Sequence, residues 1–314
     1  MKATTSFPAL ARRKPSNLGR RLNKSKYLLL LFAPAFIYFV VFRYLPMFGV
    51  LIAFKDYNVF KGVWDSPWVG FKHFKMFFTM PEAWRIVRNT LLLGIYTTFF
   101  GFWPPILLAL LLNEIRHGMY KRVVQTVSYL PHFISTVTAV SMITVALSPD
   151  GFINDFIKSI GVEPINFLVK AEWFRTIYIG SGIWQTIGWG SIIYLASLAG
   201  VDPVLYEAAE MDGASRFRKI WHINVPAMVP TIVIILILDV GRLLEIGFEK
   251  VYLLYNPAVY STADIIPTFV YRTGIEGGRF SLATSIDIYF GVIGIIMMYT
   301  VNYISRKVSD TSLW

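Results

Sequence analysis

The sequence contains no cysteine and only four histidines among 314 residues. The absence of cysteine excludes disulfides and thiol chemistry, but it does not identify a compartment. The histidines are too scattered to form a metal site with the usual ligand spacing; they are His73, His117, His132 and His222. No G-x-x-x-x-G-K-S/T motif is present, so no P-loop for ATP is predicted. We interpret the chain as a non-enzyme with no cofactor and no metal.

Charged residues are also scarce. They make up 16% of the chain, against about 25% in an average soluble protein. Hydrophobic residues make up 55%, and the mean hydropathy is +0.54. This composition predicts an integral membrane protein.

Acidic residues are missing from the first 26 positions, which hold 8 of the 30 Lys and Arg residues. The remaining 22 basic residues are nearly balanced by 19 acidic ones, so the net charge of +11 is an effect of this tail. A basic segment directly before an apolar span is typical of a cytoplasmic face beside anionic lipid. We therefore interpret residues 1–26 as a cytoplasmic tail that meets membrane lipid, and we predict no nucleic-acid partner.

Six apolar stretches reach the roughly 20 residues that a helix needs to cross a bilayer. The first could be mistaken for a signal peptide, but no small-residue cleavage site follows it, so we expect an uncleaved span. The sequence predicts an all-α fold in which residues 27–314 form one domain. The predicted spans are 27–48, 89–113, 123–149, 176–201, 227–246 and 282–304.

The loops between these spans alternate in length and charge. The short loop 114–122 carries three basic residues and one acid, whereas 49–88, 148–175 and 247–281 are longer and mixed. Short basic loops stay in the cytoplasm, and long loops translocate more freely. Both termini and the loop 202–226 are therefore predicted to be cytoplasmic.

The loop 202–226 is predicted to form two helices around a bend. Asp202 suits the N-cap, Pro203 the first helical position and Gly213 a left-handed stop, which predicts a helix over 203–212. A second helix is expected to start at Ser215 and to end at Pro226. A ten-residue helix is unstable alone in water, so the first one should dock onto a partner.

The spacing within this loop resembles the EAA loop of type-I ABC importer permeases. That pattern is EAA, three residues, Gly, nine residues and I-x-L-P, and this chain departs from it only at Val225, which replaces Leu. A hairpin without a partner remains the alternative, and a helix-turn-helix is excluded because about 25 tethered residues leave no core for it. The resemblance assigns ATPase coupling to Glu207, Ala208, Ala209, Asp212, Gly213 and Pro226.

Four further segments resemble permeases of binding-protein-dependent importers for multiple or complex sugars. The resemblance runs from about residue 27 to 314 and is carried by PMFGVLIAFKDYN (46–58), SPWVGF (66–71), SYLPHFIS (128–135) and GWGSIIYLASLAGVDP (188–203). It implies a multi-pass protein of a prokaryotic cytoplasmic membrane that passes an oligosaccharide inward. The implied partners are a second, non-identical permease, two cytoplasmic ATP-binding subunits and an extracytoplasmic solute-binding protein. The motif glutamate, here Glu207, would pair with a basic residue of the ATPase.

Polar and aromatic residues inside the predicted spans are the candidates for substrate contact, because polar groups are costly in lipid and usually face a cavity. Aromatic faces stack on sugar rings while polar groups fix the hydroxyls. Packing is the alternative role for the aromatic residues, which lie beside small glycines. The candidates are Trp184, Gln185, Trp189, Tyr194, Asp239, Arg242, Glu245 and Asp287.

Three of these candidates, Asp239, Arg242 and Glu245, are spaced by three residues and are expected to form one stripe on the fifth span. A neutral sugar has little use for a cation such as Arg242, whereas an acidic one pairs with a guanidinium through two parallel hydrogen bonds. We therefore hypothesise an acidic oligosaccharide as cargo. The alternatives are a self-neutralising triad, an importer for a non-sugar solute, and a membrane sensor that borrows the fold.

Overall fold

A computed structural model describes residues 25–115 and 117–308. It divides into two units, with the boundary between Leu51 and Ile52. The predicted cytoplasmic tail 1–26 lies outside the described residues, except for Ser25 and Lys26.

The first unit contains the first predicted span. Helix α2 (Lys26–Phe39) continues through the π turn η1 (Val40–Tyr44) into the 3-10 helix η2 (Leu45–Phe54), within which the unit ends. The whole run, Lys26–Phe54, is long and apolar enough to cross a membrane. It extends past the predicted end at residue 48 because the next charged residue after Arg43 is Lys55.

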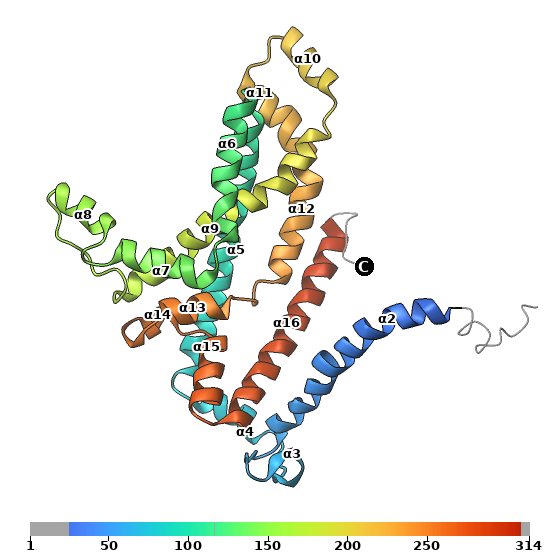
Figure 1. The fold of residues 1–314 in the computed structure, drawn as a ribbon, viewed down its shortest axis with the longest axis vertical. Coiled ribbons are helices and arrows are strands. Elements are labelled where there is room, and N and C mark those ends of the chain that lie inside the picture. The colour runs from blue at the N-terminus through green and yellow to red at the C-terminus, as the bar shows by residue number, and fades with distance from the viewer. Residues whose placement is uncertain (1–24, 116, 309–314) are drawn as a thin grey trace, which may run out of the picture. The chain divides into compact units, whose positions relative to one another are not determined.

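The second unit is helical throughout its described part, with only two isolated β-bridges, Lys55 to Trp68 and Asn58 to Gly62. Long helices alternate with short ones (Figure 1). In chain order they are α3 (Gly62–Asp65), α4 (Lys72–Thr79), α5 (Ala83–Asn113), α6 (Gly118–Tyr129), η3 (Leu130–Phe133), α7 (Thr136–Leu147), α8 (Phe152–Ser159), α9 (Ala171–Ala199), α10 (Pro203–Met211), α11 (Arg216–Lys219), η4 (Ile220–Asn224), α12 (Val225–Gly241), α13 (Phe248–Leu254), η5 (Pro257–Val259), α14 (Tyr260–Ala263), α15 (Ile266–Tyr271), η6 (Arg272–Glu276) and α16 (Phe280–Val308).

Five helical runs of the described chain can cross a membrane by length and composition, and six if α9 and α10, which meet at 73°, count as one broken span. The predicted all-α, six-span fold class is therefore confirmed. The run through α11, η4 and α12 is continuous, so the expectation that Pro226 ends a helix is wrong. Pro226 lies in the first turn of α12, where a missing N–H is tolerated, directly after the π turn.

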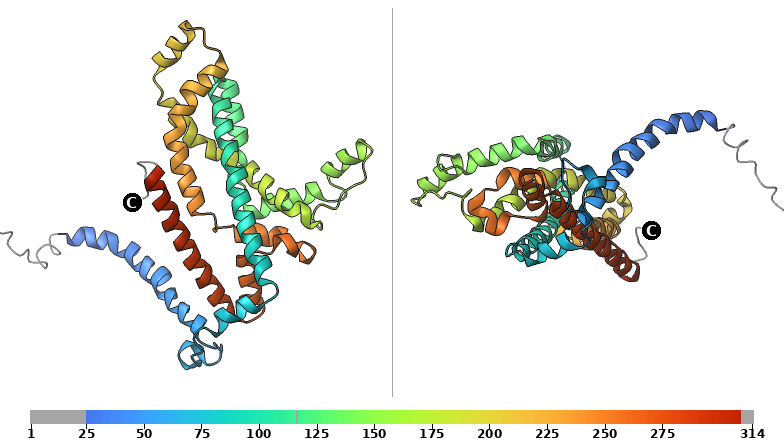
Figure 2. Two further views of the ribbon diagram at one scale, coloured as in Figure 1. Left: turned by 180° about the vertical axis from the view of Figure 1, so that it is seen from behind. Right: turned by 90° about the horizontal axis from the view of Figure 1, so that it is seen from below.

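The third span differs from the prediction of one helix over 123–149. It is interrupted at η3, and α7 lies across the direction of α6 (Figures 1 and 2). Pro131 lies in η3, and Ile134 then turns the backbone to an extended conformation. Ser135 caps the new helix by accepting a hydrogen bond from the Thr138 N–H at 3.2 Å. The hydropathy pattern did not predict this break, because residues 123–149 are uncharged throughout and hydropathy carries no information on backbone direction.

The fifth span is shorter than predicted. α12 ends at Gly241, and Arg242 occupies its C-cap with φ −100° and ψ 10°. The expected helical stripe of Asp239, Arg242 and Glu245 is therefore wrong, because Glu245 lies beyond the helix. Non-helical backbone at this depth is tolerated where protein covers it or a cavity borders it. Here a Cβ on Gly94 of α5 would overlap the Leu243 carbonyl oxygen, so α5 covers this segment.

Small residues allow α9 to approach its neighbours closely. A Cβ on Gly188 would overlap the backbone carbonyl of Ser128 in α6, and one on Gly190 would lie 3.1 Å from the Pro105 side chain in α5. Tight helix contacts of this kind replace the hydrophobic driving force that lipid does not supply. Three apolar clusters complete the second unit. Their buried members include Leu93, Phe174 and Val251 in the first, Phe77, Ile86 and Leu282 in the second, and Phe102, Tyr194 and Met228 in the third.

Gly188→Ala should destabilise the protein, because its Cβ meets backbone rather than a movable side chain. We expect a loss of about 1–3 kcal/mol, seen as a lower midpoint of thermal unfolding in detergent. Gly180→Ala on the same helix is the control, since a Cβ there meets nothing within 4 Å. Equal midpoints for the two variants would contradict the close α6–α9 crossing.

Candidate functional site

The predicted coupling helix is present as α10, at one end of the second unit beside α11 (Figure 1). Asp202 caps it, with Oδ1 accepting from the Val204 N–H at 3.0 Å, and Pro203 opens it as predicted. Gly213 has φ +72°, a backbone region in which a Cβ is strained. The caps that the sequence indicated therefore define α10 to within one residue.

Two side-chain contacts hold α10 against the helical run that returns to the membrane. The Tyr206 hydroxyl donates to Asn224 Oδ1 at 2.5 Å, and Lys219 Nζ donates to Glu210 Oε1 at 2.7 Å. Asn224 is fully buried in the π turn η4. The orientation of α10 is thus fixed from within the chain before any partner binds.

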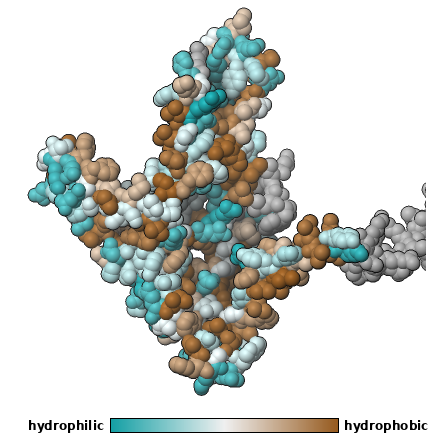
Figure 3. All heavy atoms as spheres, viewed as in Figure 1, coloured by the Kyte–Doolittle hydropathy of each residue, from teal (hydrophilic) through white to brown (hydrophobic). Residues whose placement is uncertain are grey.

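The outer side of α10 remains open. Glu207 and Ala208 are exposed, and the apolar side chains of Val204, Leu205 and Met211 are exposed by 61%, 53% and 88%. Space-filling atoms over the α10 end show hydrophilic and hydrophobic residues intermixed (Figure 3). A short, rigid helix with a carboxylate beside exposed apolar groups can dock into a groove and transmit its movement.

A second candidate site is a series of three hollows along α16. The first hollow, of about 300 Å³, lies at the start of α16; the second, of about 380 Å³, shares Phe280 with it. The third, of about 400 Å³, shares Pro267 and Asp287 with the second and continues to Met298. Between Phe280 and Met298 an α-helix rises about 27 Å, close to the thickness of a bilayer's hydrocarbon core.

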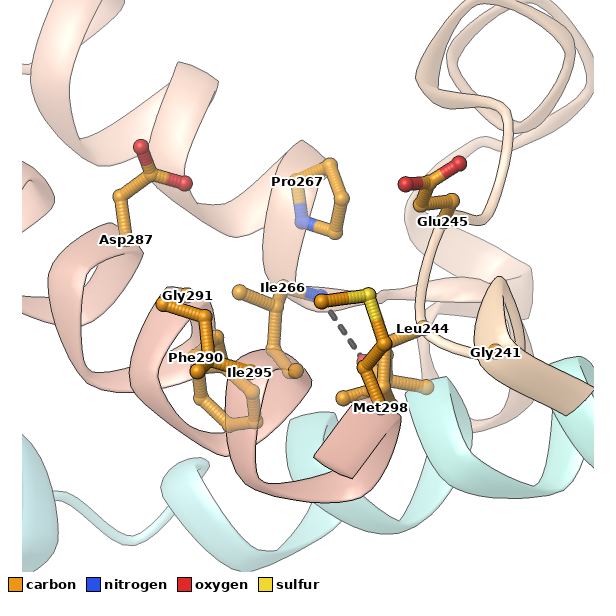
Figure 4. A pocket seen from close by; sticks show the side chains of 12 residues that line it. Gly241, Leu244, Glu245, Ile266, Pro267, Asp287, Phe290, Gly291, Ile295 and Met298 are labelled. Atoms are coloured by element: carbon orange, nitrogen blue, oxygen red, sulfur yellow. Dashed lines mark hydrogen bonds between the residues drawn. The ribbon is translucent and has the colours of Figure 1, made fainter. Parts of the chain in front are cut away.

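Two of the predicted substrate-path residues border the third hollow. Asp287 on α16 and Glu245 on the segment after α12 lie on opposite sides of Pro267 (Figure 4). Both are exposed in the second unit. The remaining lining is mainly apolar, with Phe290 and Ile295 among its members. Carboxylates on facing walls of such a hollow can accept hydrogen bonds from hydroxyl groups.

The other predicted path residues are spread over several places. Trp184 borders an apolar hollow of about 690 Å³ between α7, α8 and α9. Trp189 stacks on His132, with ring centres 4.6 Å apart, which ties α9 to η3. Tyr194 is only 2% exposed in the cluster with Phe102 and Met228, which favours a packing role.

The polar candidates Gln185 and Arg242 differ in their surroundings. Gln185 Oε1 accepts from Lys250 Nζ at 3.4 Å. Arg242 is exposed at the end of α12, and no carboxylate in the described chain lies within 4.0 Å of its guanidinium. The three-member triad with Asp239 and Glu245 therefore does not form as an ion-paired unit.

Sequence reasoning missed a buried polar network beyond the third hollow. Asn89 Nδ2 donates to the carbonyls of Ser261 and Asp264 at 3.1 and 3.2 Å, and its Oδ1 accepts from Arg175 at 3.0 Å. The Asp264 carboxylate, fully buried, is held by two hydrogen bonds from Arg272. A polar residue such as Asn89 inside an apolar stretch was the available signal.

Lys250 on α13 was also missed. Its Nζ lies 5.1 Å from the centre of the Tyr178 ring, and it pairs with no carboxylate in the part of the chain that the structure describes. The residues around it in sequence, such as Glu249 and Tyr252, do not predict that the lysine contacts α9. In the described ranges no group of three His, Cys, Asp or Glu side chains could hold a metal ion.

Comparison with known proteins identifies the family. The family model "Binding-protein-dependent transport system inner membrane component" matches residues 101–310. Protein LplB of Bacillus subtilis (strain 168) is 47% identical over 308 residues, covering 98% of this chain and 97% of the relative. The polygalacturonan/rhamnogalacturonan transport system permease protein YteP of the same organism is 46% identical over 302 residues, covering 96% and 94%.

Solved structures agree. A chain of a bacterial ABC transporter involved in the import of the acidic polysaccharide alginate has a TM-score of 0.86 at 40% identity, covering 94% of this chain and 100% of its own. A second structure, in complex with an alginate pentasaccharide-bound periplasmic protein, has a TM-score of 0.86 at 39% identity, covering 95% and 100%. These matches confirm the resemblance to ABC importer permeases that the EAA spacing indicated, and the resemblance to sugar importers that the four further segments indicated. The chain belongs to the family of binding-protein-dependent transport system inner membrane components.

Proposed function

We propose that this chain is one permease subunit of an ABC importer that carries an acidic oligosaccharide into a prokaryotic cytoplasm. A second, non-identical permease, two cytoplasmic ATP-binding subunits and an extracytoplasmic solute-binding protein complete the importer. The chain itself hydrolyses no ATP, and its part is mechanical.

The observation that carries this proposal is the geometry of α10. The Tyr206–Asn224 contact and the Lys219–Glu210 ion pair hold it to the run Arg216–Gly241, while Glu207 stays open. Movement imposed on α10 by an ATPase subunit would therefore reach α12 directly. Glu207 supplies the charge-assisted contact and Met211 the apolar one.

Two observations support an acidic cargo. Arg242 lies at the end of α12 with no carboxylate of the described chain within 4.0 Å, and Asp239 interacts with it only from farther away. Such a weakly paired cation within a membrane is costly unless an anion or water reaches it. The names of similar proteins refer to alginate, an acidic polysaccharide, and to polygalacturonan. A guanidinium binds a sugar carboxylate through two parallel hydrogen bonds, which lysine cannot reproduce.

The third hollow suits the hydroxyl groups of the same cargo. Glu245 and Asp287 accept hydrogen bonds from hydroxyls, and Phe290 offers an apolar face to the sugar ring. Acidic and neutral sugars both carry hydroxyl groups that can make these contacts, whereas Glu245 and Asp287 repel the carboxylate of an acidic sugar. Selection by charge is therefore left to cations such as Arg242.

The proposed orientation places α10 and both termini in the cytoplasm. Because the chain has no natural cysteine, each single substitution introduces one thiol. A membrane-impermeant thiol reagent applied to intact cells should label Asp65→Cys and Ser159→Cys but leave Gly118→Cys unlabelled. Labelling of Gly118→Cys from outside would refute this topology.

Coupling through α10 is tested with Glu207→Lys, which reverses the charge of the docking carboxylate. We expect the ATPase subunits to bind at least about tenfold more weakly in a co-purification assay, because a charge-assisted contact is lost. Gly213→Val should act in the same direction, since φ +72° strains a β-branched residue. Glu163→Lys, an exposed acid in a different loop, is the control and should bind normally. Normal co-purification and uptake by Glu207→Lys would rule out the docking role.

The cargo charge is tested with Arg242→Gln, which keeps a polar side chain of similar length while removing the charge. Uptake of an acidic oligosaccharide should fall at least about tenfold, with assembly unchanged. Arg242→Lys should retain part of the uptake because the cation remains. If assembly fails, or if uptake is unaffected, Arg242 is structural and its role in selecting the cargo should be abandoned.

A further inference from the structure

The first hollow along α16 has a built, polar wall that the coupling and substrate sites do not use. It lies between α4, the segment around Tyr57 and the first turn of α16. Ser281 Oγ accepts from the Tyr57 N–H at 2.9 Å and donates to the Lys55 carbonyl at 2.7 Å. Two segments that are far apart in sequence are thereby fixed around one hollow.

The hollow has more positive than negative charge. Lys72 and Arg279 line it against one carboxylate, Asp56, which is paired with Lys72 Nζ at 3.1 Å. The hydrogen bond found for the Arg279 guanidinium goes to Met76 Sδ at 3.5 Å, and sulfur is a weak acceptor. Within the described chain no carboxylate lies within 4.0 Å of Arg279. Its charge is therefore available to an anion.

His73 lines the same hollow and lacks a close, well-aligned hydrogen bond. It is 7% exposed, and neither Nδ1 nor Nε2 makes a hydrogen bond; Nε2 lies 3.8 Å from Asp56 Oδ1. Burial lowers the pKa of its imidazole below the usual range, with Lys72 and Arg279 acting in the same direction and Asp56 and the backbone of Lys55 opposing them. A buried imidazole that makes no close hydrogen bond is costly to keep.

The start of α16 adds partial positive charge. The first N–H groups of a helix have no acceptor within it, and they attract anions. Phe280, Ser281 and Leu282 form this first turn and line the hollow. Gly278, with φ +66°, makes the turn that leads Arg279 into it. A guanidinium, a buried histidine and a long helix's N-terminus thus meet in one polar hollow.

We propose that this hollow binds one carboxylate of the acidic oligosaccharide as it enters the permease. The inference rests on the proposed function and adds an entry subsite to it. The neighbouring hollows favour cargo over a receptor side chain or a lipid phosphate, because Phe280 also lines the second hollow, and Asp287 lines both the second and the third. A sugar chain whose carboxylate is held at Arg279 can extend along α16 toward Glu245.

The test uses the assembled importer in detergent, without the solute-binding protein. The probes are a pentasaccharide of galacturonic acid and its methyl ester, which has the same length without the charge. The wild type should bind the acid form at least about tenfold more tightly than the ester. Arg279→Gln should remove this preference without changing affinity for the ester, and Arg279→Lys should restore part of it. Lys75→Gln, an exposed cation on α4 outside the hollow, should leave both affinities unchanged.

Several results would overturn the inference. The first is a wild type with no preference for the acid form. A second is an Arg279→Gln variant that keeps the preference but binds the solute-binding protein more weakly, which would make the hollow a receptor contact. A third is an Arg279→Gln variant that keeps the preference for the acid form but loses bound phospholipid in native mass spectrometry.

Two further measurements keep the test decisive. If Arg279→Gln fails to assemble, the salt dependence of the wild type replaces it as the test. The preference for the acid form should decline with rising salt, because a partly exposed ionic contact is screened. A preference independent of salt would contradict the inference. Failure here leaves the proposed function intact if Arg242→Gln still lowers uptake. The proposed function itself fails if the assembled importer takes up no acidic oligosaccharide.

Discussion

The structure depends on one constraint: backbone N–H and C=O groups within lipid must be paired inside the chain. This constraint forces long helices, and it makes every interruption informative. The break at η3 lies against α9, where Gly188 admits the Ser128 carbonyl. The end of α12 is covered by α5 at Gly94 and borders the third hollow through Glu245. Interruptions occur where protein or a cavity replaces lipid, and these are the places where cargo can be handled.

The same constraint explains how α10 can act as a lever. The helix leaves the membrane after α9 at a bend of 73° and returns through a run that is continuous from Arg216 to Gly241. A continuous helix transmits displacement along its axis with little loss, and Tyr206 and Lys219 tie α10 to its start. Arg242 directly follows the far end of that run, beside the proposed route of the cargo. The proposed sites of coupling and of cargo handling therefore lie at the two ends of one element.

Sequence reasoning succeeded where structure is set locally. The caps at Asp202 and Gly213 depend on a few neighbouring residues, so α10 could be predicted to within one residue. It failed where distant segments decide. Pro226 was expected to end a helix but is accommodated after a π turn, and the predicted stripe through Arg242 is broken by packing of Leu243 on α5. The hollow around His73 and Arg279 joins segments separated by about 200 residues, which no local pattern indicates.

The most direct test of the account is ATP hydrolysis by the reconstituted importer in response to loaded solute-binding protein. The account predicts that the chain purifies with a second permease and ATP-binding subunits. It also predicts that a solute-binding protein carrying an acidic oligosaccharide stimulates hydrolysis and sugar uptake together. A chain that purifies alone, or a complex whose hydrolysis does not respond to the loaded binding protein, would contradict it.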